Sequence, residues 1–161
     1  MGKDKAPDKT NVMRLLDQAG IDCVQRFYDP DETAGEAVAA LLGEPPECVF
    51  KTLVTVSDRG DHFVFVIPVT GSLDLKKAAR AAGRKSVVMI KQKELLPLTG
   101  YVHGGCSPVG MKKPFPTFID ETALITDAFF CSAGRRGAQV GVDPQALADY
   151  IGAVFADLTE E

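Results

Sequence analysis

Residues 49–69 read VFKTLVTVSDRGDHFVFVIPV, the clearest structural signal in the chain. Two runs of β-branched and other apolar residues, Val49–Val56 and Phe63–Val69, flank the polar segment Ser57–Asp61, which contains a glycine. Strand-forming runs separated by a short polar, glycine-containing segment are typical of a β-hairpin. The sequence therefore predicts two adjacent antiparallel strands here.

Outward from this hairpin, the chain shows further short segments with strand or helix patterns. Further strands are predicted at Val87–Ile90, Thr117–Asp120, Phe129–Ser132 and Ala138–Val142. Helices are predicted from Val12 to Gly20, from a T-x-x-E capping motif at Thr33 to Gly43, over Leu73–Ala82, and from Pro144 to about Leu158. Irregularly mixed strands and helices predict an α+β fold, and the short strands suit a strongly curved, barrel-like sheet surrounded by helices.

Length and composition predict one globular domain. The chain has 161 residues, of which 45% are hydrophobic and 25% charged, as in an ordinary single domain. We expect a flexible tail over residues 1–10 and a single domain over 11–161. No apolar run reaches the ~18–20 residues of a membrane helix, and the lysine-rich start lacks the apolar region of a secretory signal. We therefore expect a cytoplasmic protein without a membrane partner.

Metal binding is not predicted. The four cysteines show no C-x-x-C spacing, and the chain has two histidines, so a four-ligand zinc site would need scattered residues. Residues 51–136, in contrast, carry 13 basic and 7 acidic side chains. This excess suits a local polyanion site or, equally, a solvated helix face.

The least regular stretch, residues 99–114, reads TGYVHGGCSPVGMKKP. Its glycines would let backbone N–H groups approach a ligand oxygen, although a long structural loop has the same composition. A phosphate-binding P-loop is excluded, because Met111 stands where its lysine is required. His103, Cys106 and Ser107 lack the strand–turn–helix context of a nucleophile elbow, so structural roles are favoured over a nucleophile–base pair.

The residues alone leave open the role of two basic features, Lys51 and the segment Ser132–Gly137. Lys51 shares a strand face with apolar Val49 and Leu53, so it either extends to solvent at the strand end or points into a pocket. The segment Ser132–Gly137 reads SAGRRG, and its paired arginines suit phosphate or carboxylate binding, or a plain hairpin tip. Arg136 is therefore a candidate binding residue.

These segments together resemble the YbaK/EbsC family of editing enzymes, whose best-known members are bacterial Cys-tRNA(Pro) deacylases. The resemblance rests on VFKTL at 49–53, PVTGSLDLKK at 68–77, GYVHGGCSPVGMKK at 100–113, PT at 116–117, ID at 119–120 and SAGRRG at 132–137. It runs from about Asn11 to the last helix.

The resemblance implies a barrel-like editing domain, related to the insertion domain of bacterial prolyl-tRNA synthetases, that acts in trans on mischarged tRNA. Lys51 matches the essential lysine, which anchors the terminal adenosine and the aminoacyl ester. The residues that match the substrate-binding positions are Tyr28, Gly104, Gly105, Cys106, Ser107, Pro108, Ser132 and Gly134. The implied partner is the acceptor end of a tRNA, with a prolyl-tRNA synthetase as a further candidate, and no cofactor or metal is implied.

The implied chemistry needs no protein nucleophile, because an aminoacyl ester is already activated and mainly requires placement and oxyanion stabilisation. In the cysteine-specific members, the thiol of the substrate attacks its own ester. Two departures affect the expected pocket: Ala34 stands where an aromatic residue is expected, and Gln139 stands where an acid is expected. Deacylation of Ala- or Ser-tRNA and a non-catalytic tRNA- or nucleotide-binding module are therefore alternatives. A third alternative, a sensor of small anionic metabolites, would use the glycine and arginine loops alone.

Overall fold

The predicted hairpin lies at the centre of the larger of two β-sheets in the computed structural model, which describes residues 8–32 and 34–161. The strands are β1 (Cys23–Phe27), β2 (Phe50–Ser57), β3 (His62–Pro68), β4 (Val87–Met89), β5 (Thr117–Asp120), β6 (Phe129–Ser132), β7 (Ala138–Val142) and β8 (Val154–Ala156). The helices are α1 (Asn11–Gln18), α2 (Gly35–Leu42), α3 (Leu75–Ala82), α4 (Gln92–Thr99) and α5 (Pro144–Ile151), with 3-10 helices η2 (Pro46–Cys48) and η3 (Glu121–Ile125). The α+β prediction is confirmed.

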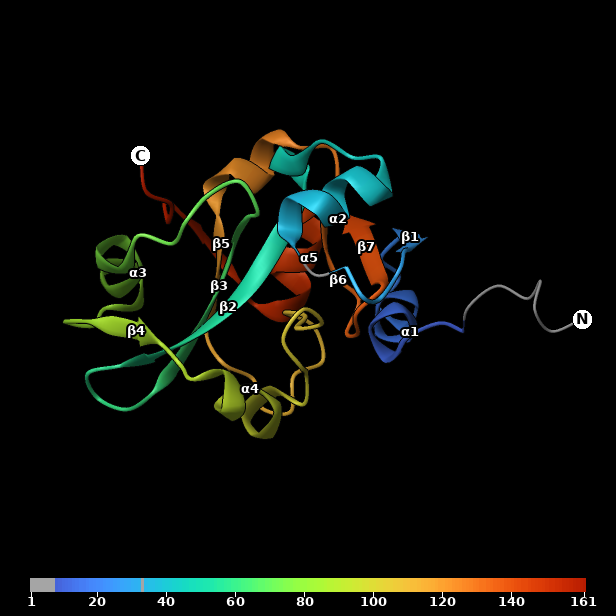
Figure 1. Ribbon diagram of the computed structural model, residues 1–161. Coiled ribbons are helices and arrows are strands. Elements are labelled where there is room, and N and C mark those ends of the chain that lie inside the picture. The colour runs from blue at the N-terminus through green and yellow to red at the C-terminus, as the bar shows by residue number, and fades with distance from the viewer. Residues whose placement is uncertain (1–7, 33) are drawn as a thin grey trace, which may run out of the picture.

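The expected barrel-like sheet is not supported for the described residues, because their strands form two sheets and neither is closed. One has the order β4-β2-β3-β5-β8 and the other the order β1-β7-β6. β2 and β3 are antiparallel, whereas β5 and β8 add in parallel. The two sheets meet at a single parallel bridge between Val49 and Phe130, and α1 and α3 lie at opposite ends of the molecule (Figure 1).

The C-terminal segment also differs from its prediction. The helix expected to reach Leu158 ends at Ile151, because Gly152 adopts a left-handed conformation with φ of 71° and caps it. The apolar residues that follow form β8, which extends the larger sheet beside β5. Pro144 begins this helix as predicted, and the Asp143 side chain accepts a hydrogen bond from the Ala146 N–H.

The larger sheet is buried on both faces at its central strand, β3. On β3, Val64 and Val66 contribute to a core shared with α1, α5 and the smaller sheet. The alternate residues Phe63, Phe65 and Ile67 pack on the opposite face against α3. A strand covered on both sides needs apolar residues at every position, which explains why β3 reads as a continuous apolar run.

Two expectations near the N-terminus involve residues outside this description. Residues 1–7 of the expected tail are not described, and neither is Thr33 of the expected capping motif. Thr10, within the remainder of the expected tail, is buried and caps α1, its hydroxyl accepting a hydrogen bond from the Met13 N–H. No helix in the described parts of the chain has the length and apolar character needed to cross a membrane.

Removing the Asp61 carboxylate should weaken the hairpin at neutral pH and have less effect in acid. Arg84 donates to this carboxylate from Nε at 3.2 Å and Nη2 at 2.5 Å, and Ser57 donates through its hydroxyl. The Arg84 hydrogen bond, followed by that of Ser57, lowers the pKa of Asp61 below its ordinary value. Stability from a carboxyl with a lowered pKa is present above the ordinary pKa of ~4 and is lost as the pH falls further.

Urea unfolding of wild type and Asp61→Asn at pH 7 and pH 3 measures this dependence. We expect the urea midpoint of the variant to fall below that of wild type by more at pH 7 than at pH 3. The difference should be small at both pH values, because the Arg84–Asp61 ion pair is partly exposed. An equal difference at both pH values would contradict the assignment.

Candidate active site

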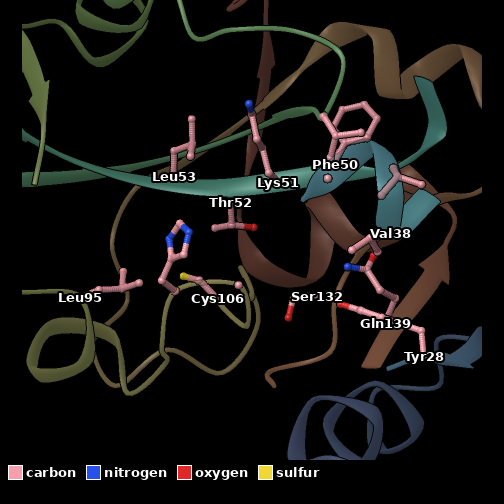
Figure 2. Close-up of a pocket in the computed structure, with 15 residues that line it drawn as sticks. Tyr28, Val38, Phe50, Lys51, Thr52, Leu53, Leu95, Cys106, Ser132 and Gln139 are labelled. Atoms are coloured by element: carbon pink, nitrogen blue, oxygen red, sulfur yellow. The ribbon is translucent and has the colours of Figure 1, made fainter. Parts of the chain in front are cut away.

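A cavity of about 170 Å³ opens at one edge of β2, beside the glycine-rich loop that follows α4 (Figure 2). β2 pairs with β3 over residues 50–56, but with β4 on its other edge only over residues 55–57. Within the described chain, no strand therefore pairs with that edge of β2 at residues 50–53, between the bridge to β6 at Val49 and the pairing with β4. The cavity occupies this gap in the sheet.

Five of the predicted site residues line this one cavity: Tyr28, Lys51, Gly104, Cys106 and Ser132. They come from four parts of the sequence that are far apart. Tyr28 follows β1, Lys51 lies on β2, Gly104 and Cys106 belong to the loop after α4, and Ser132 ends β6. The fold therefore brings together segments that the sequence analysis selected separately.

Lys51 and its neighbour Thr52 leave β2 on opposite sides. Figure 2 shows the Lys51 side chain on the same side as Leu53, as the strand pattern predicts, whereas Thr52 points toward Cys106 and Ser132. Lys51 is half-buried, and no ion pair of its ammonium is found among residues 8–32 and 34–161. Lys51 therefore contributes to the wall, while its charge is directed away from the polar groups inside.

The other predicted residues of the two loops lie outside this cavity. Gly134 lines a second cavity of about 400 Å³, and Pro108 lines a third of about 330 Å³. Ser107 is fully buried, with its hydroxyl accepting a hydrogen bond from the Val109 N–H at 3.1 Å. These three residues shape the loops rather than face the first cavity.

Gly105 and Arg136 hold the two loops together. A Cβ atom on Gly105 would lie 2.9 Å from the Arg135 Cα, so only glycine permits this close approach of backbones. The Arg136 Nε donates a hydrogen bond to the His103 carbonyl oxygen at 2.8 Å. Both contacts connect the 100–114 loop to the 132–137 loop, next to Gly104 and Cys106 in the cavity wall.

Two oxygen atoms in the cavity wall are buried without a hydrogen-bond partner among the described residues: Thr52 Oγ1 and Gln139 Oε1. Gln139 is 6% exposed and lies on β7, the central strand of the smaller sheet. A buried polar group without a partner costs about 1–3 kcal/mol. Such groups in a cavity wall are available to accept hydrogen bonds from a bound ligand.

Cys106 is buried in the wall and remains a thiol at neutral pH. Burial raises the pKa of Cys106 to about 12, and a hydrogen bond with the Thr99 side chain only partly offsets this. Because the thiolate is the nucleophilic form of cysteine, this side chain is poorly suited to attack an ester.

Replacing Cys106 by serine should leave activity within about twofold of wild type, because no protein thiolate is required. Rates of aminoacyl-tRNA hydrolysis, with Cys48→Ser as a control at a half-buried position outside the cavity, measure this effect. A loss of more than about tenfold in Cys106→Ser alone would instead assign Cys106 a direct chemical role.

A metal centre has no basis in the described residues. Across residues 8–32 and 34–161, no group of three or more His, Cys, Asp or Glu side chains is placed to hold a metal ion. His103 lines the cavity, whereas His62 lies on β3 and packs against Phe115 at 5.6 Å between ring centroids.

Comparison with known proteins identifies the fold. The family model described as the aminoacyl-tRNA editing domain matches residues 29–150. The chain belongs to this family. The match includes the 100–114 and 132–137 loops and most of the first cavity, with Tyr28 immediately outside its start.

Relatives of this editing domain occur both alone and within larger enzymes. A protein of Enterococcus faecalis, provisionally named Cys-tRNA(Pro)/Cys-tRNA(Cys) deacylase EbsC, is 42% identical over 161 aligned residues, which cover 99% of this chain and 98% of that protein. A proline–tRNA ligase of Burkholderia orbicola is 28% identical over 121 residues, which are 73% of this chain but 21% of the ligase.

Solved structures show the same architecture. A crystal structure described provisionally as a trans-editing enzyme for prolyl-tRNA synthetase superposes with a TM-score of 0.80 and 31% sequence identity, covering 93% of this chain and 95% of that one. A hypothetical protein superposes with a TM-score of 0.85 and 27% identity, covering 92% and 99%.

Several residues that line the cavity of this editing domain were not predicted as site residues. Thr52 is adjacent to Lys51 and follows the alternation of β2, so a prediction that considered both faces of the strand could have included it. Val38 lies on α2 and Leu95 on α4, and no sequence signal distinguishes them from ordinary apolar helix residues. Gln139 was noted as a departure, and the structure places it in the wall.

Proposed function

We propose that this editing domain hydrolyses the ester bond between a small amino acid and the 3′ end of a tRNA, with Cys-tRNA(Pro) as its main substrate. The observation that carries the proposal is the cavity between β2 and the 100–114 loop. It lies in a domain whose family is defined by aminoacyl-tRNA editing. A whole-length relative carries the provisional name of a Cys-tRNA(Pro)/Cys-tRNA(Cys) deacylase.

The size of the cavity supports a small acyl group. Engineered cavities of ~150 Å³ hold one benzene molecule, so about 170 Å³ accommodates a small amino acid but not the adenosine as well. Apolar side chains of Val38, Val49 and Phe50 form part of the wall, and the polar groups of Thr52 and Ser132 form another part. The adenosine would therefore remain at the mouth of the cavity.

Lys51 lines the cavity while its ammonium points away from the polar groups inside, which suits a role at the mouth. A cation without an ion pair among the described residues is available to a phosphate or ester oxygen, and such charge-assisted hydrogen bonds are stronger than neutral ones. Lys51 would bind the terminal nucleotide and hold the ester at the cavity entrance. This assignment keeps the expected anchoring role and places it beside the pocket rather than inside it.

The cavity requires no nucleophile from the protein if the substrate provides one. The cysteine thiol of the substrate attacks its own ester carbonyl, which forms a carbon–sulfur bond and breaks the bond to the ribose oxygen. The thiol proton passes to the departing ribose oxygen, which becomes the free hydroxyl of the tRNA, and water then opens the cyclic thioester to free cysteine. The protein contributes placement and hydrogen bonds to the developing oxyanion.

Release of amino acid from tRNA(Pro) charged with cysteine, serine, alanine or proline tests the proposal. We expect the purified protein to release cysteine fastest and to leave the proline ester intact. Rapid release of alanine or serine with little release of cysteine would favour the alternative specificity. Binding of the charged tRNAs without any release of amino acid would contradict an enzymatic function and favour a binding module.

A further inference from the structure

The first cavity contains two oxygen atoms that the proposed reaction does not yet use, Thr52 Oγ1 and Gln139 Oε1. Both are buried and lack a hydrogen-bond partner among residues 8–32 and 34–161. Figure 2 shows the Thr52 hydroxyl and the Gln139 side chain on the same side of β2, near Ser132. We propose that Thr52 and Gln139 bind the α-amino group of the acyl moiety and so determine specificity for aminoacyl esters, an inference that rests on the proposed function.

An amino group matches this pair because it can donate from one nitrogen to two acceptors. A glutamine Oε1 can only accept a hydrogen bond, and a threonine hydroxyl can accept as well as donate. A thiol or hydroxyl of a substrate has a single hydrogen to donate, and a thiol is a weak donor. The α-amino group therefore has enough hydrogens to donate to both oxygens, whereas the cysteine side chain has only one.

The two acceptors have fixed positions because they lie on paired strands. Gln139 is opposite Arg26 of β1 and Ser132 of β6, so β7 is held on both edges. Thr52 is opposite Val66 in the central hairpin. Binding groups carried on paired strands keep their geometry better than groups on loops, which favours discrimination between closely related acyl groups.

The pocket would recognise the amino group without a charged partner. Among the described residues that line the cavity there is no Asp or Glu, and an amide occupies position 139. Recognition would therefore depend on the hydrogen-bonding pattern rather than on charge pairing, and an acyl group that lacks the amine would leave both oxygens unpaired. A site built to bind an N–H group discriminates strongly against an analogue without it.

Binding of two non-hydrolysable ligands tests this assignment independently of turnover. The probes are 3′-cysteinylamino-3′-deoxyadenosine, an amide mimic of the charged tRNA end, and its analogue without the α-amino group. Isothermal titration calorimetry should show that wild type binds the amine-bearing ligand about 10- to 100-fold more tightly. Gln139→Met, which retains side-chain length but removes the acceptor, should reduce this preference to less than about threefold.

Two further variants keep the test decisive. Thr52→Val keeps the size of the side chain and should also reduce the preference for the amine-bearing ligand. This variant decides the test if circular dichroism shows that Gln139→Met does not fold. Gln145→Met makes the same substitution at an exposed residue of α5, where the amide donates to Asp149, and should retain the full preference.

Equal affinities of wild type for the two ligands, or a preference that persists in both pocket variants, would overturn the inference. If wild type prefers the amine but releases nothing from charged tRNA, the amino-group site stands and the proposed hydrolysis fails. If wild type hydrolyses the ester but shows no preference for the amine-bearing ligand, the proposed hydrolysis stands and the amino-group site fails.

Discussion

Replacing Lys51 by methionine is expected to lower kcat/KM for Cys-tRNA(Pro) by about 10- to 100-fold, mainly through a higher KM. Methionine retains most of the aliphatic stem that lines the cavity but removes the ammonium. A charge-assisted hydrogen bond contributes about 1.5–3 kcal/mol, which corresponds to this range. Steady-state release of cysteine over a series of tRNA concentrations measures both constants.

Lys85→Met is the matched control for Lys51→Met. Lys85 is exposed and lies between α3 and β4, outside the cavity, so this variant makes the same change in net charge. We expect its kinetic constants to stay within about twofold of wild type. Unchanged kinetics in a folded Lys51→Met variant would remove Lys51 from the site, whereas equal losses in both variants would indicate a general effect of charge.

Replacing Gly105 by alanine is expected to affect both stability and activity. The added Cβ would lie 2.9 Å from the Arg135 Cα and 3.0 Å from the Arg136 N, which are backbone atoms that cannot rotate away. Overpacking of this kind costs about 1–3 kcal/mol, and a shift of ~1 Å in a binding wall can lower the rate by about 100-fold. Urea unfolding and deacylation rates measure the two effects.

Gly71→Ala provides the comparison for this glycine. Its Cβ would lie 3.1 Å from the Thr159 Cγ2, a side-chain atom of a residue that does not line the cavity, so a small adjustment can relieve the contact. We expect this variant to remain active. If Gly105→Ala kept full activity and stability, the close approach of the two loops would not shape the cavity.

The fold was predictable from the sequence where a pattern was local. The β2–β3 hairpin follows from two apolar runs around Ser57–Asp61, and the start of α5 follows from Asp143 and Pro144. The end of α5 was missed because the apolar residues after Gly152 continue a helix-like spacing, although in the structure they pair with β5. α4 was missed for a different reason. Pro97 lies inside it, and a proline within a segment argues against a helix.

The arrangement of the strands in two open sheets could not be predicted from the sequence. Strand order depends on contacts between distant segments, such as the pairing of β1 with β7, and no local pattern specifies them. β1 itself was not predicted, because its five residues, CVQRF, mix polar and apolar side chains. Its position beside β7 brings Tyr28, the next residue after β1, into the cavity wall.

The candidate site was predictable in part. The glycine-rich loop, Lys51 and Ser132 were found from composition and resemblance, and the structure brings them to one cavity. The sequence could not show that Ser107 is turned inward, or that Gly105 contacts Arg135. It also could not show that Thr52 rather than Lys51 points toward Cys106, because that depends on which side of β2 the loop packs.

The most direct test of the account is the crystal structure of the protein with 3′-cysteinylamino-3′-deoxyadenosine. The account predicts that the cysteinyl group lies in the cavity between β2 and the 100–114 loop, in contact with Thr52 and Gln139, with the adenosine at the mouth near Lys51. A ligand bound instead in the second cavity, beside Tyr101 and Arg135, with the first cavity empty, would contradict it.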